Sequence, residues 1–110
     1  MFASGLGHYS LRVNGAAASD HVLDPGWTNY HRTVQFVAYD LTGQLQKGDN
    51  VLGAHVVNGF YAGDQGDRFF WPMYEDNTYV RYGNELCFFS ELHLFFDDGE
   101  HAVHISDPNH

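Results

Sequence analysis

Strict alternation of apolar and polar side chains along residues 8–14 constrains the fold more than any other feature of this sequence. The odd-numbered residues from Tyr9 to Val13 are apolar and their neighbours are polar, a period of two that is typical of a β-strand with one buried face. Asn14-Gly15 follows at once, and this pair favours a tight hairpin because both residues tolerate positive φ. Residues 16–18 are therefore expected to return as a short second strand.

Three further segments extend the β-pattern into the middle of the chain. Residues 32–39 alternate and predict another strand. Residues 51–57 are apolar at almost every position, which predicts a central strand that is covered on both faces. Between these two strands, residues 40–45 are expected to form one helical turn with Asp40 as its N-cap, and residues 48–50 to form a turn.

Residues 85–106 predict a long β-hairpin. Its first strand is expected to run from Leu86 to Phe96, with Asp98-Gly99 as a two-residue turn before the returning strand. This register pairs Leu92 with Ile105, Leu94 with Val103, Phe96 with His101 and His93 with His104, and it turns the first three pairs towards the core. Since no long segment has a helical period, we expect an all-β protein, a single antiparallel β-sandwich over residues 1–110 with no helix longer than about two turns.

Composition limits the partners of the chain. Lysine and arginine number 5 against 14 acidic residues, a formal net charge of −9, which would repel a phosphate backbone or an anionic membrane. No apolar run reaches the ~18 residues of a membrane helix, and the first residues lack a signal-peptide pattern.

Cys87 is the only cysteine, so the chain cannot form an intrachain disulfide. Because Cys87 lies within an apolar run, it is expected to be buried. We expect a soluble chain without nucleic-acid or membrane partners, and the compartment stays open.

The reactive side chains form no catalytic or metal-binding motif. The chain has 8 histidines, but CxxC and HExxH are absent, and His101 and His104 would lie on opposite faces of a strand. The predicted pairing of His93 with His104 supplies only two ligands, so a surface pair is a better interpretation than a zinc site. No spacing selects two carboxylates for a glycosidase, and Asp64 and Asp67 lack the ligand ladder of an EF-hand. We expect the chain to have no glycosidase activity of its own.

Two irregular segments carry many aromatic residues: residues 20–30, the first aromatic loop, and residues 58–84, the second aromatic loop. Aromatic rings stack on the C–H face of a sugar, and amides or carboxylates hold its hydroxyls, so such loops on a β-scaffold indicate a sugar site. Composition alone favours the alternative, an aromatic plug over the end of the sandwich with Trp27 in the core. The candidates are Trp27, Tyr30, Tyr61 and Trp71 for stacking and Asp24, Asn29 and Asn58 for hydroxyl groups. We expect residues 24–30 and 58–61 to lie side by side.

A series of motifs runs in order through almost the whole chain. They are Gly5–Gly15, Val22–Tyr30, Val34–Phe36, Tyr39–Thr42, Leu45–Asn50, Asn58–Tyr61 and the final hairpin with Asp98-Gly99 and Ser106-Asp107. Together they resemble the N-terminal domain of bacterial α-L-rhamnosidases, a family that usually has Trp in place of Phe60. The chain departs from that family at residues 69–82, which resemble an aromatic insertion.

The resemblance implies a jelly-roll β-sandwich of the galactose-binding-like kind, placed ahead of an (α/α) barrel whose acidic residues carry out the hydrolysis. None of the barrel is present in the sequence, and the family has a further strand before Phe2 and continues past Asp107. The resemblance therefore implies a non-catalytic fragment of a larger glycoside hydrolase that lacks terminal strands and has the catalytic barrel as its partner. Sheet edges left open in this way would favour self-association.

The resemblance also implies two alternative roles for the aromatic loops. Some related domains bind rhamnose-type sugars with calcium, whereas others only support the catalytic domain. For the first role the site residues would be Asp24, Trp27, Tyr30, Asn58 and Tyr61, with Asp24 as the calcium ligand. For the second role the same aromatic residues would be buried between domains in a purely structural docking module.

Overall fold

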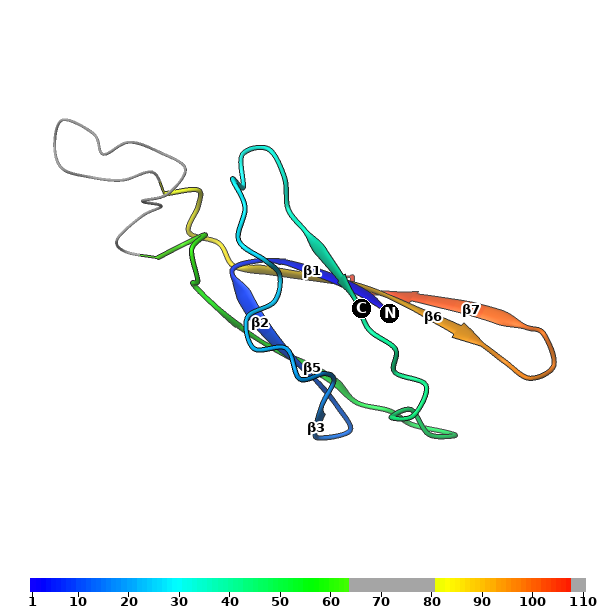
Figure 1. Cartoon of the computed structure of the whole chain (residues 1–110). Helices are drawn as coiled ribbons and strands as arrows, with labels where there is room; N and C mark the ends of the chain where they lie inside the picture. The colour runs from blue at the N-terminus through cyan, green and yellow to red at the C-terminus, as the bar shows by residue number, and fades with distance from the viewer. Residues whose placement is uncertain (64–80, 108–110) are drawn as a thin grey trace, which may run out of the picture.

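Antiparallel strands in two sheets make up the chain in the computed structural model, which describes residues 1–63 and 81–107. The strands are β1 (Phe2–Leu6), β2 (His8–Val13), β3 (Ala16–Ala17), β4 (Phe36–Ala38), β5 (Leu52–Val57), β6 (Cys87–Phe95) and β7 (His101–Ile105). One sheet has the strand order β4-β1-β6-β7 and the other has the order β3-β2-β5 (Figure 1). The predicted all-β antiparallel sandwich is confirmed. Within the described ranges, no helix is long and apolar enough to cross a bilayer.

The core lies between the two sheets, and β2 supplies more of it than any other strand. Tyr9, Leu11 and Val13 are buried, as the alternation predicted, and they pack with Ala3 of β1 and Leu92 of β6. The other members of the buried cluster are Ala18, Tyr39 and Leu41. The apolar side of β2, in the three-stranded sheet, thus packs against β1 and β6 of the four-stranded sheet.

The chain passes from one sheet to the other at a single residue, Gly7. β1 ends at Leu6 and β2 begins at His8, so Gly7 turns the backbone out of the four-stranded sheet and into the three-stranded one. The φ angle of Gly7 is +112°, and a Cβ atom there would lie 2.5 Å from the Val57 carbonyl oxygen. Glycine alone fits both this backbone conformation and this close approach.

Two predicted local features are confirmed. Asn14-Gly15 has φ angles of +50° and +85°, positive at both positions as a tight hairpin requires, and β3 pairs with β2 behind it. The Asp40 carboxylate accepts the Thr42 N–H at 3.0 Å, and the Leu45 N–H donates to the Leu41 carbonyl oxygen at 3.1 Å. The Leu41–Leu45 bond closes the single helical turn that we expected over residues 40–45, and the Asp40 carboxylate caps it.

The strand predicted over residues 32–39 is shorter than expected. β4 covers only its last part, because the N–H groups of Arg32 and Thr33 both donate to the Asn29 carbonyl oxygen, at 2.9 and 3.0 Å. These bonds form a turn that keeps residues 32 and 33 out of the sheet.

The prediction that residues 51–57 form a covered central strand is wrong. β5 lies at the edge of its sheet, and β2 is its one partner strand in the described part of the chain. Five of its six residues are exposed. An apolar run predicts burial only if another layer covers it, and none of the described elements covers the outer side of β5.

The loop of the last hairpin has three residues, in contrast to the two that we predicted. The Phe96 N–H donates to the Glu100 carbonyl oxygen at 2.9 Å, so these two residues close the loop. Gly99 has a φ angle of +88°, the left-handed conformation that is common at the last position of three-residue loops. The turn is where the sequence predicts it, but the register is wrong by one residue.

A shift by one residue exchanges the two faces of β7. The buried Leu92 pairs with His104, and His93 pairs with Val103. His104 therefore lies on the core side of β7, and Val103 lies on the opposite side. The residues predicted to face the core that instead lie outside are Ile105, Val103 and His101. Cys87, which we expected to be buried, is exposed at the start of β6. The prediction that His101 and His104 lie on opposite faces is confirmed.

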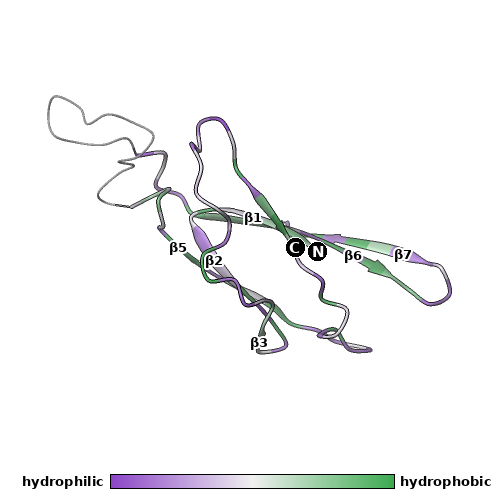
Figure 2. Cartoon of the chain, viewed as in Figure 1, coloured by the Kyte–Doolittle hydropathy of each residue, from purple (hydrophilic) through white to green (hydrophobic). Residues whose placement is uncertain are grey.

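The four-stranded sheet has a broad apolar surface on the side away from the core. Large side chains from all four strands lie on it, each 43–77% exposed. They are Phe36 of β4, Phe2 of β1, Phe89 and Phe95 of β6, and Val103 and Ile105 of β7, and we call this set the outer face. Figure 2 shows hydrophobic stretches along β1 and β6. Glu91, His93 and His101 lie on the same side of the sheet, among these apolar side chains. Exposed apolar surfaces of this size often contact another protein.

Candidate functional site at two aromatic loops

The two aromatic loops lie side by side, as predicted. The rings of Trp27 and Phe60 are stacked, with centroids 3.8 Å apart and an interplanar angle of 7°. Tyr30 meets Tyr61 edge-on at 5.5 Å. One aromatic cluster is therefore built from two segments that are far apart in the sequence.

Both loops meet because each is attached to the start of β2. The Tyr9 N–H donates to the Asp24 carbonyl oxygen at 2.6 Å, which fastens the first loop there. The second loop follows β5, whose last residue Val57 pairs with His8, the first residue of β2. The end of the sandwich that holds the cluster is thus set by backbone pairing.

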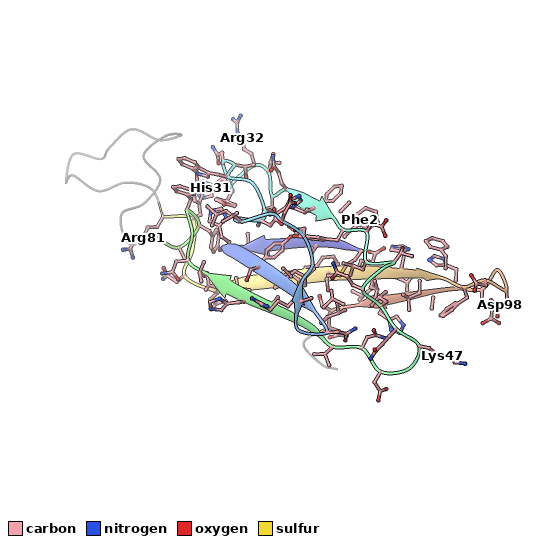
Figure 3. The ribbon with its side chains drawn as sticks, turned by 60° about the horizontal axis from the view of Figure 1, so that its bottom comes forward. Phe2, His31, Arg32, Lys47, Arg81 and Asp98 are labelled. Atoms are coloured by element: carbon pink, nitrogen blue, oxygen red, sulfur yellow. The ribbon has the colours of Figure 1, made fainter. Side chains whose placement is uncertain are left out.

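Tyr82, near the end of the second aromatic loop, also belongs to the cluster. Its ring contacts Tyr30 edge-on at 5.1 Å and His31 at 4.8 Å. Figure 3 shows His31 and Arg81 at this same end of the molecule. Nothing in the sequence singled out Tyr82 except its place in the aromatic insertion.

Among the predicted sugar-contact residues, four gather at the meeting of the loops. Trp27 is half-buried with one ring face against Phe60, Tyr30 is buried, Tyr61 is half-buried and Asn58 is exposed. Of these four residues, Asn58 is the most exposed and Trp27 is half-buried, so a ligand from outside would meet these two side chains first.

Other candidates have different positions. The Asn29 side-chain oxygen accepts the His31 N–H at 3.1 Å and supports the turn in the first loop. The predictions for Asp64, Asp67, Trp71 and most of the aromatic insertion lie outside the described residues. Within residues 1–63 and 81–107, no group of three or more His, Cys, Asp or Glu is placed to hold a metal ion.

The Asp24 carboxylate has partners inside the chain. It accepts a hydrogen bond from the Tyr39 hydroxyl, and it lies 3.1 Å from His21 Nδ1. The hydroxyl oxygens of Tyr39 and Tyr9 are 3.4 Å apart, so two buried tyrosines and one carboxylate form a network beneath the first loop. This geometry gives Asp24 a role in anchoring the loop, and its role as a calcium ligand stays a prediction.

Burial keeps the tyrosines of this network protonated. Burial, followed by the hydrogen bond to Asp24, raises the pKa of Tyr39 far above its usual range. Burial also raises the pKa of Tyr9. The Tyr39 hydroxyl therefore remains a donor to the Asp24 carboxylate at neutral and mildly alkaline pH.

We expect the folded chain to lose stability as the pH rises above about 10. An unfolded tyrosine ionises near that pH, whereas Tyr9 and Tyr39 keep their protons in the fold because their pKa values are raised. The folded state then binds more protons, so the free energy of unfolding falls by up to about 1.4 kcal/mol per pH unit for each tyrosine. Urea unfolding across this pH range measures the fall. Tyr39→Phe should make it shallower, and an unchanged slope would contradict the role of Tyr39.

His8 is a residue of this site that the alternation pattern missed. Its place on the polar side of residues 8–14 predicted exposure, yet it is only 5% exposed. The Phe60 ring lies edge-on to it at 5.6 Å, and a Cβ atom on Gly59 would lie 2.4 Å from its ring. Neither ring nitrogen has a hydrogen-bond partner within the described residues. Buried polar groups are normally paired, and a neutral imidazole offers one donor and one acceptor.

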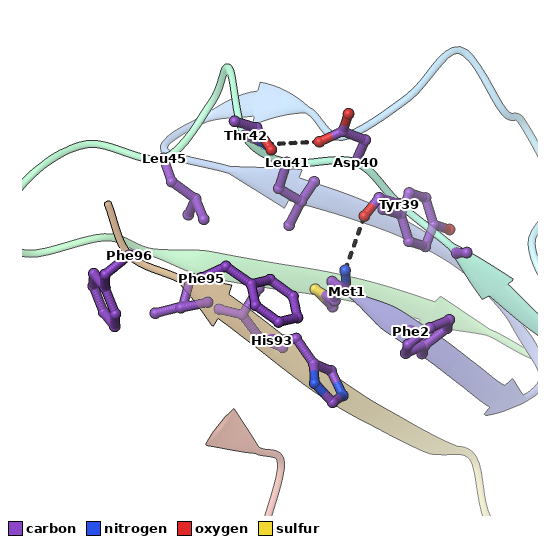
Figure 4. A pocket seen from close by; sticks show the side chains of 13 residues that line it. Met1, Phe2, Tyr39, Asp40, Leu41, Thr42, Leu45, His93, Phe95 and Phe96 are labelled. Carbon is purple, nitrogen blue, oxygen red and sulfur yellow. Dashed lines mark hydrogen bonds between the residues drawn. The ribbon is translucent and has the colours of Figure 1, made fainter. Parts of the chain in front are cut away.

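A separate apolar groove lies between the turn at residues 40–45 and the end of β6, with a volume of about 760 Å³. Its lining includes Met1, Leu41, Leu45, Leu92, Leu94 and Phe96. The Met1 ammonium donates to the Tyr39 carbonyl oxygen at 2.9 Å beside it (Figure 4). Phe2 and Phe95 also line the groove, so its apolar surface continues onto the outer face. Asp40, Thr42 and His93 add polar groups to this lining.

Comparison with known proteins places the whole chain in one family. A family model described as the alpha-L-rhamnosidase N-terminal domain matches residues 1–110. An alpha-L-rhamnosidase of Streptomyces avermitilis is 33% identical over 109 residues, which are 99% of this chain and 10% of that protein. An alpha-L-rhamnosidase of Formosa agariphila is 29% identical over 108 residues, 97% of this chain and 11% of that protein.

Solved structures have the same fold. The native α-L-rhamnosidase from Aspergillus terreus matches with a TM-score of 0.83 and 31% identity, over 98% of this chain and 12% of that one. The Streptomyces avermitilis α-L-rhamnosidase complexed with L-rhamnose matches with a TM-score of 0.80 and 34% identity, over 97% of this chain and 10% of that one. The chain thus spans about a tenth of the length of these relatives.

Proposed function

Because this chain belongs to the α-L-rhamnosidase N-terminal domain family, we propose that it is a non-catalytic accessory domain that packs against and supports the catalytic part of a larger α-L-rhamnosidase-like glycoside hydrolase. The observation that carries this proposal is the outer face. It presents exposed Phe, Val and Ile side chains on all four strands of one sheet. A sheet surface with this many exposed apolar side chains suits a second layer of protein more than a small ligand.

The size of the outer face supports a docking role. Full burial of one such side chain contributes about 1.5–3 kcal/mol, so covering the exposed portions of the whole set contributes on the order of 5–9 kcal/mol before association costs. Those costs are small when the partner belongs to the same polypeptide. The adjoining groove extends the surface, since Phe2 and Phe95 belong to both. A catalytic domain packed here would remove this apolar area from water.

The docking role predicts a measurable effect of a single polar substitution. Phe89 lies on the outer face and is 46% exposed. With the catalytic part of a parent enzyme supplied as a separate polypeptide, we expect Phe89→Ser to weaken its association with the 110-residue chain about tenfold. Sedimentation velocity of the mixture measures the affinity.

Val22→Ser is the matched control for Phe89→Ser. Val22 is 81% exposed, but it lies in the first aromatic loop, so its loss should leave the association unchanged. Equal weakening by both substitutions would contradict docking through the outer face. The same runs with the chain alone test the predicted self-association through the open edges of β5 and β7.

Sugar binding at the aromatic loops is the second candidate function, and His8 is the observation that favours it. Its two ring nitrogens, without partners in the described part of the chain, lie under Phe60 in the cluster that also holds Trp27. Both nitrogens are buried, so a sugar would reach them only if the Phe60 ring moved aside. Two separate hydroxyl groups would then pair with them, one accepting the imidazole N–H and the other donating to the bare nitrogen. In this role Trp27, Tyr30, Asn58 and Tyr61 would contact a rhamnose-type sugar.

Titration of the chain with L-rhamnose, followed by NMR with and without calcium, tests the sugar role. We expect shifts at Trp27, Asn58 and His8 alone, and a calcium response at Asp24 if the ion displaces the Tyr39 hydroxyl. An absence of shifts at tens of millimolar sugar, well beyond the ~1 mM scale of weak recognition, would leave the loops with the structural role alone.

A further inference from the structure

Two histidines and one glutamate form a connected row on the β6–β7 hairpin. His93 Nδ1 lies 3.0 Å from His101 Nε2, and His93 Nε2 lies 2.5 Å from Glu91 Oε1. The observed register creates this row: His93 pairs with Val103, beside the pair of Phe95 and His101. The two imidazoles are therefore diagonal neighbours on the same face of the sheet.

Glu91 determines which nitrogen of His93 carries the hydrogen. An ionised carboxylate only accepts hydrogen bonds, so His93 Nε2 donates and His93 Nδ1 keeps its lone pair. That lone pair accepts the hydrogen of His101 Nε2. A metal ion bound to both nitrogens would replace this hydrogen bond. The hydrogen moves through solvent to His101 Nδ1, and the ion lies to one side of the line between the two nitrogens, because on that line it would be only about 1.5 Å from each.

The contact between Glu91 and His93 is the kind that surrounds metal ligands in proteins. A ligating histidine commonly donates its other N–H to a carboxylate, which fixes the ring and raises its basicity. With metal–nitrogen bonds of 2.0–2.1 Å, two ligand nitrogens stand about 2.9 Å apart at a right angle and about 4.1 Å apart in line. The distance of 3.0 Å between His93 Nδ1 and His101 Nε2 is close to the right-angle value, which is the geometry of neighbouring positions in square-planar Cu²⁺ and Ni²⁺ sites. It is shorter than the value of about 3.3 Å for a tetrahedral zinc site.

We propose that His93 Nδ1 and His101 Nε2 bind a divalent transition-metal ion of square-planar preference, Cu²⁺ or Ni²⁺, with Glu91 orienting His93. No third His, Cys, Asp or Glu among the described residues completes the site. Water, or a group of a protein packed on the outer face, takes the other coordination positions. The inference concerns the chain alone and holds whether or not the outer face docks.

Calorimetric titration of the 110-residue chain with CuCl₂ and with ZnCl₂ tests this site. We expect one saturable step of one ion per chain, tighter for Cu²⁺ than for Zn²⁺. In NMR spectra the imidazole signals of His93 and His101 should respond before those of other histidines. His93→Gln or His101→Gln should abolish the step, and Glu91→Gln should weaken it about 10- to 100-fold.

His104→Gln and His55→Gln are the matched controls. His104 belongs to the same strand as His101 but lies on its opposite face, and His55 is exposed on the distant β5. Both variants should retain the original affinity, and circular dichroism should show that every variant is folded. Equal loss of affinity in the controls, ions spread over many histidines, or no saturable step would overturn the proposal.

Discussion

Replacing Gly7 with alanine is expected to destabilise the chain by about 3 kcal/mol or more, a large part of the stability of a small domain. Alanine is strained at a φ of +112°, and its Cβ would lie 2.5 Å from the Val57 carbonyl oxygen. That oxygen belongs to the backbone of β5, which is held by its pairing with β2, so it cannot move aside cheaply. Urea unfolding followed by circular dichroism measures the loss.

Gly15→Ala separates the two causes of this loss. Gly15 also has a positive φ, +85°, but no atom lies within 4 Å of the position of a Cβ there. Its replacement should therefore cost only the backbone strain, about 1 kcal/mol. Equal losses in the two variants would show that the crossing at Gly7 is not tightly packed.

Asp24→Ala is expected to reduce the free energy of unfolding by about 2–3 kcal/mol. The substitution removes the charged acceptor of the Tyr39 hydroxyl and leaves that buried donor without its partner. Thermal and urea unfolding measure the loss. In combination with Tyr39→Phe the loss should be smaller than the sum of the single losses, because both substitutions remove the same bond.

Asp20→Ala is the control for Asp24→Ala. Asp20 lies in the same loop and is exposed, so its removal should change stability by no more than about 0.5 kcal/mol. If Asp24→Ala proves as stable as the original chain but alters a response to calcium, Asp24 would be a ligand and not an anchor. The experiment therefore decides between the two roles of this carboxylate.

Features that depend on neighbouring residues could be predicted from the sequence. The alternation along residues 8–14 identified β2 and its buried side, and Asn14-Gly15 identified the hairpin that follows, because both follow from local backbone geometry. The helical turn at residues 40–45 was predicted for the same reason. Motif order along the chain also identified the family correctly.

Features that depend on distant pairing could not be predicted. The hairpin loop before Glu100 has one residue more than predicted, so the side chains of β7 lie on the opposite faces from those predicted. The apolar composition of β5 could not show that this strand lies at the edge of its sheet. The meeting of the aromatic loops was predicted, but the partners of Asp24 and the burial of His8 were not. Each depends on a segment far along the chain, Tyr39 in one case and Phe60 in the other.

The position of β1 affects the order of events during synthesis. β1 lies between β4 and β6, and Phe2 pairs with Glu91, about 90 residues later, so at 5–20 residues per second β1 waits on the order of 5–20 s for that neighbour to be made. Closing such a distant pair also slows folding, since the loop entropy is lost before the contact forms. During this delay β4 can already pair with one edge of β1, whereas the other edge stays open to other proteins. We therefore expect a chaperone that binds extended apolar segments to recognise β1 before the four-stranded sheet is complete.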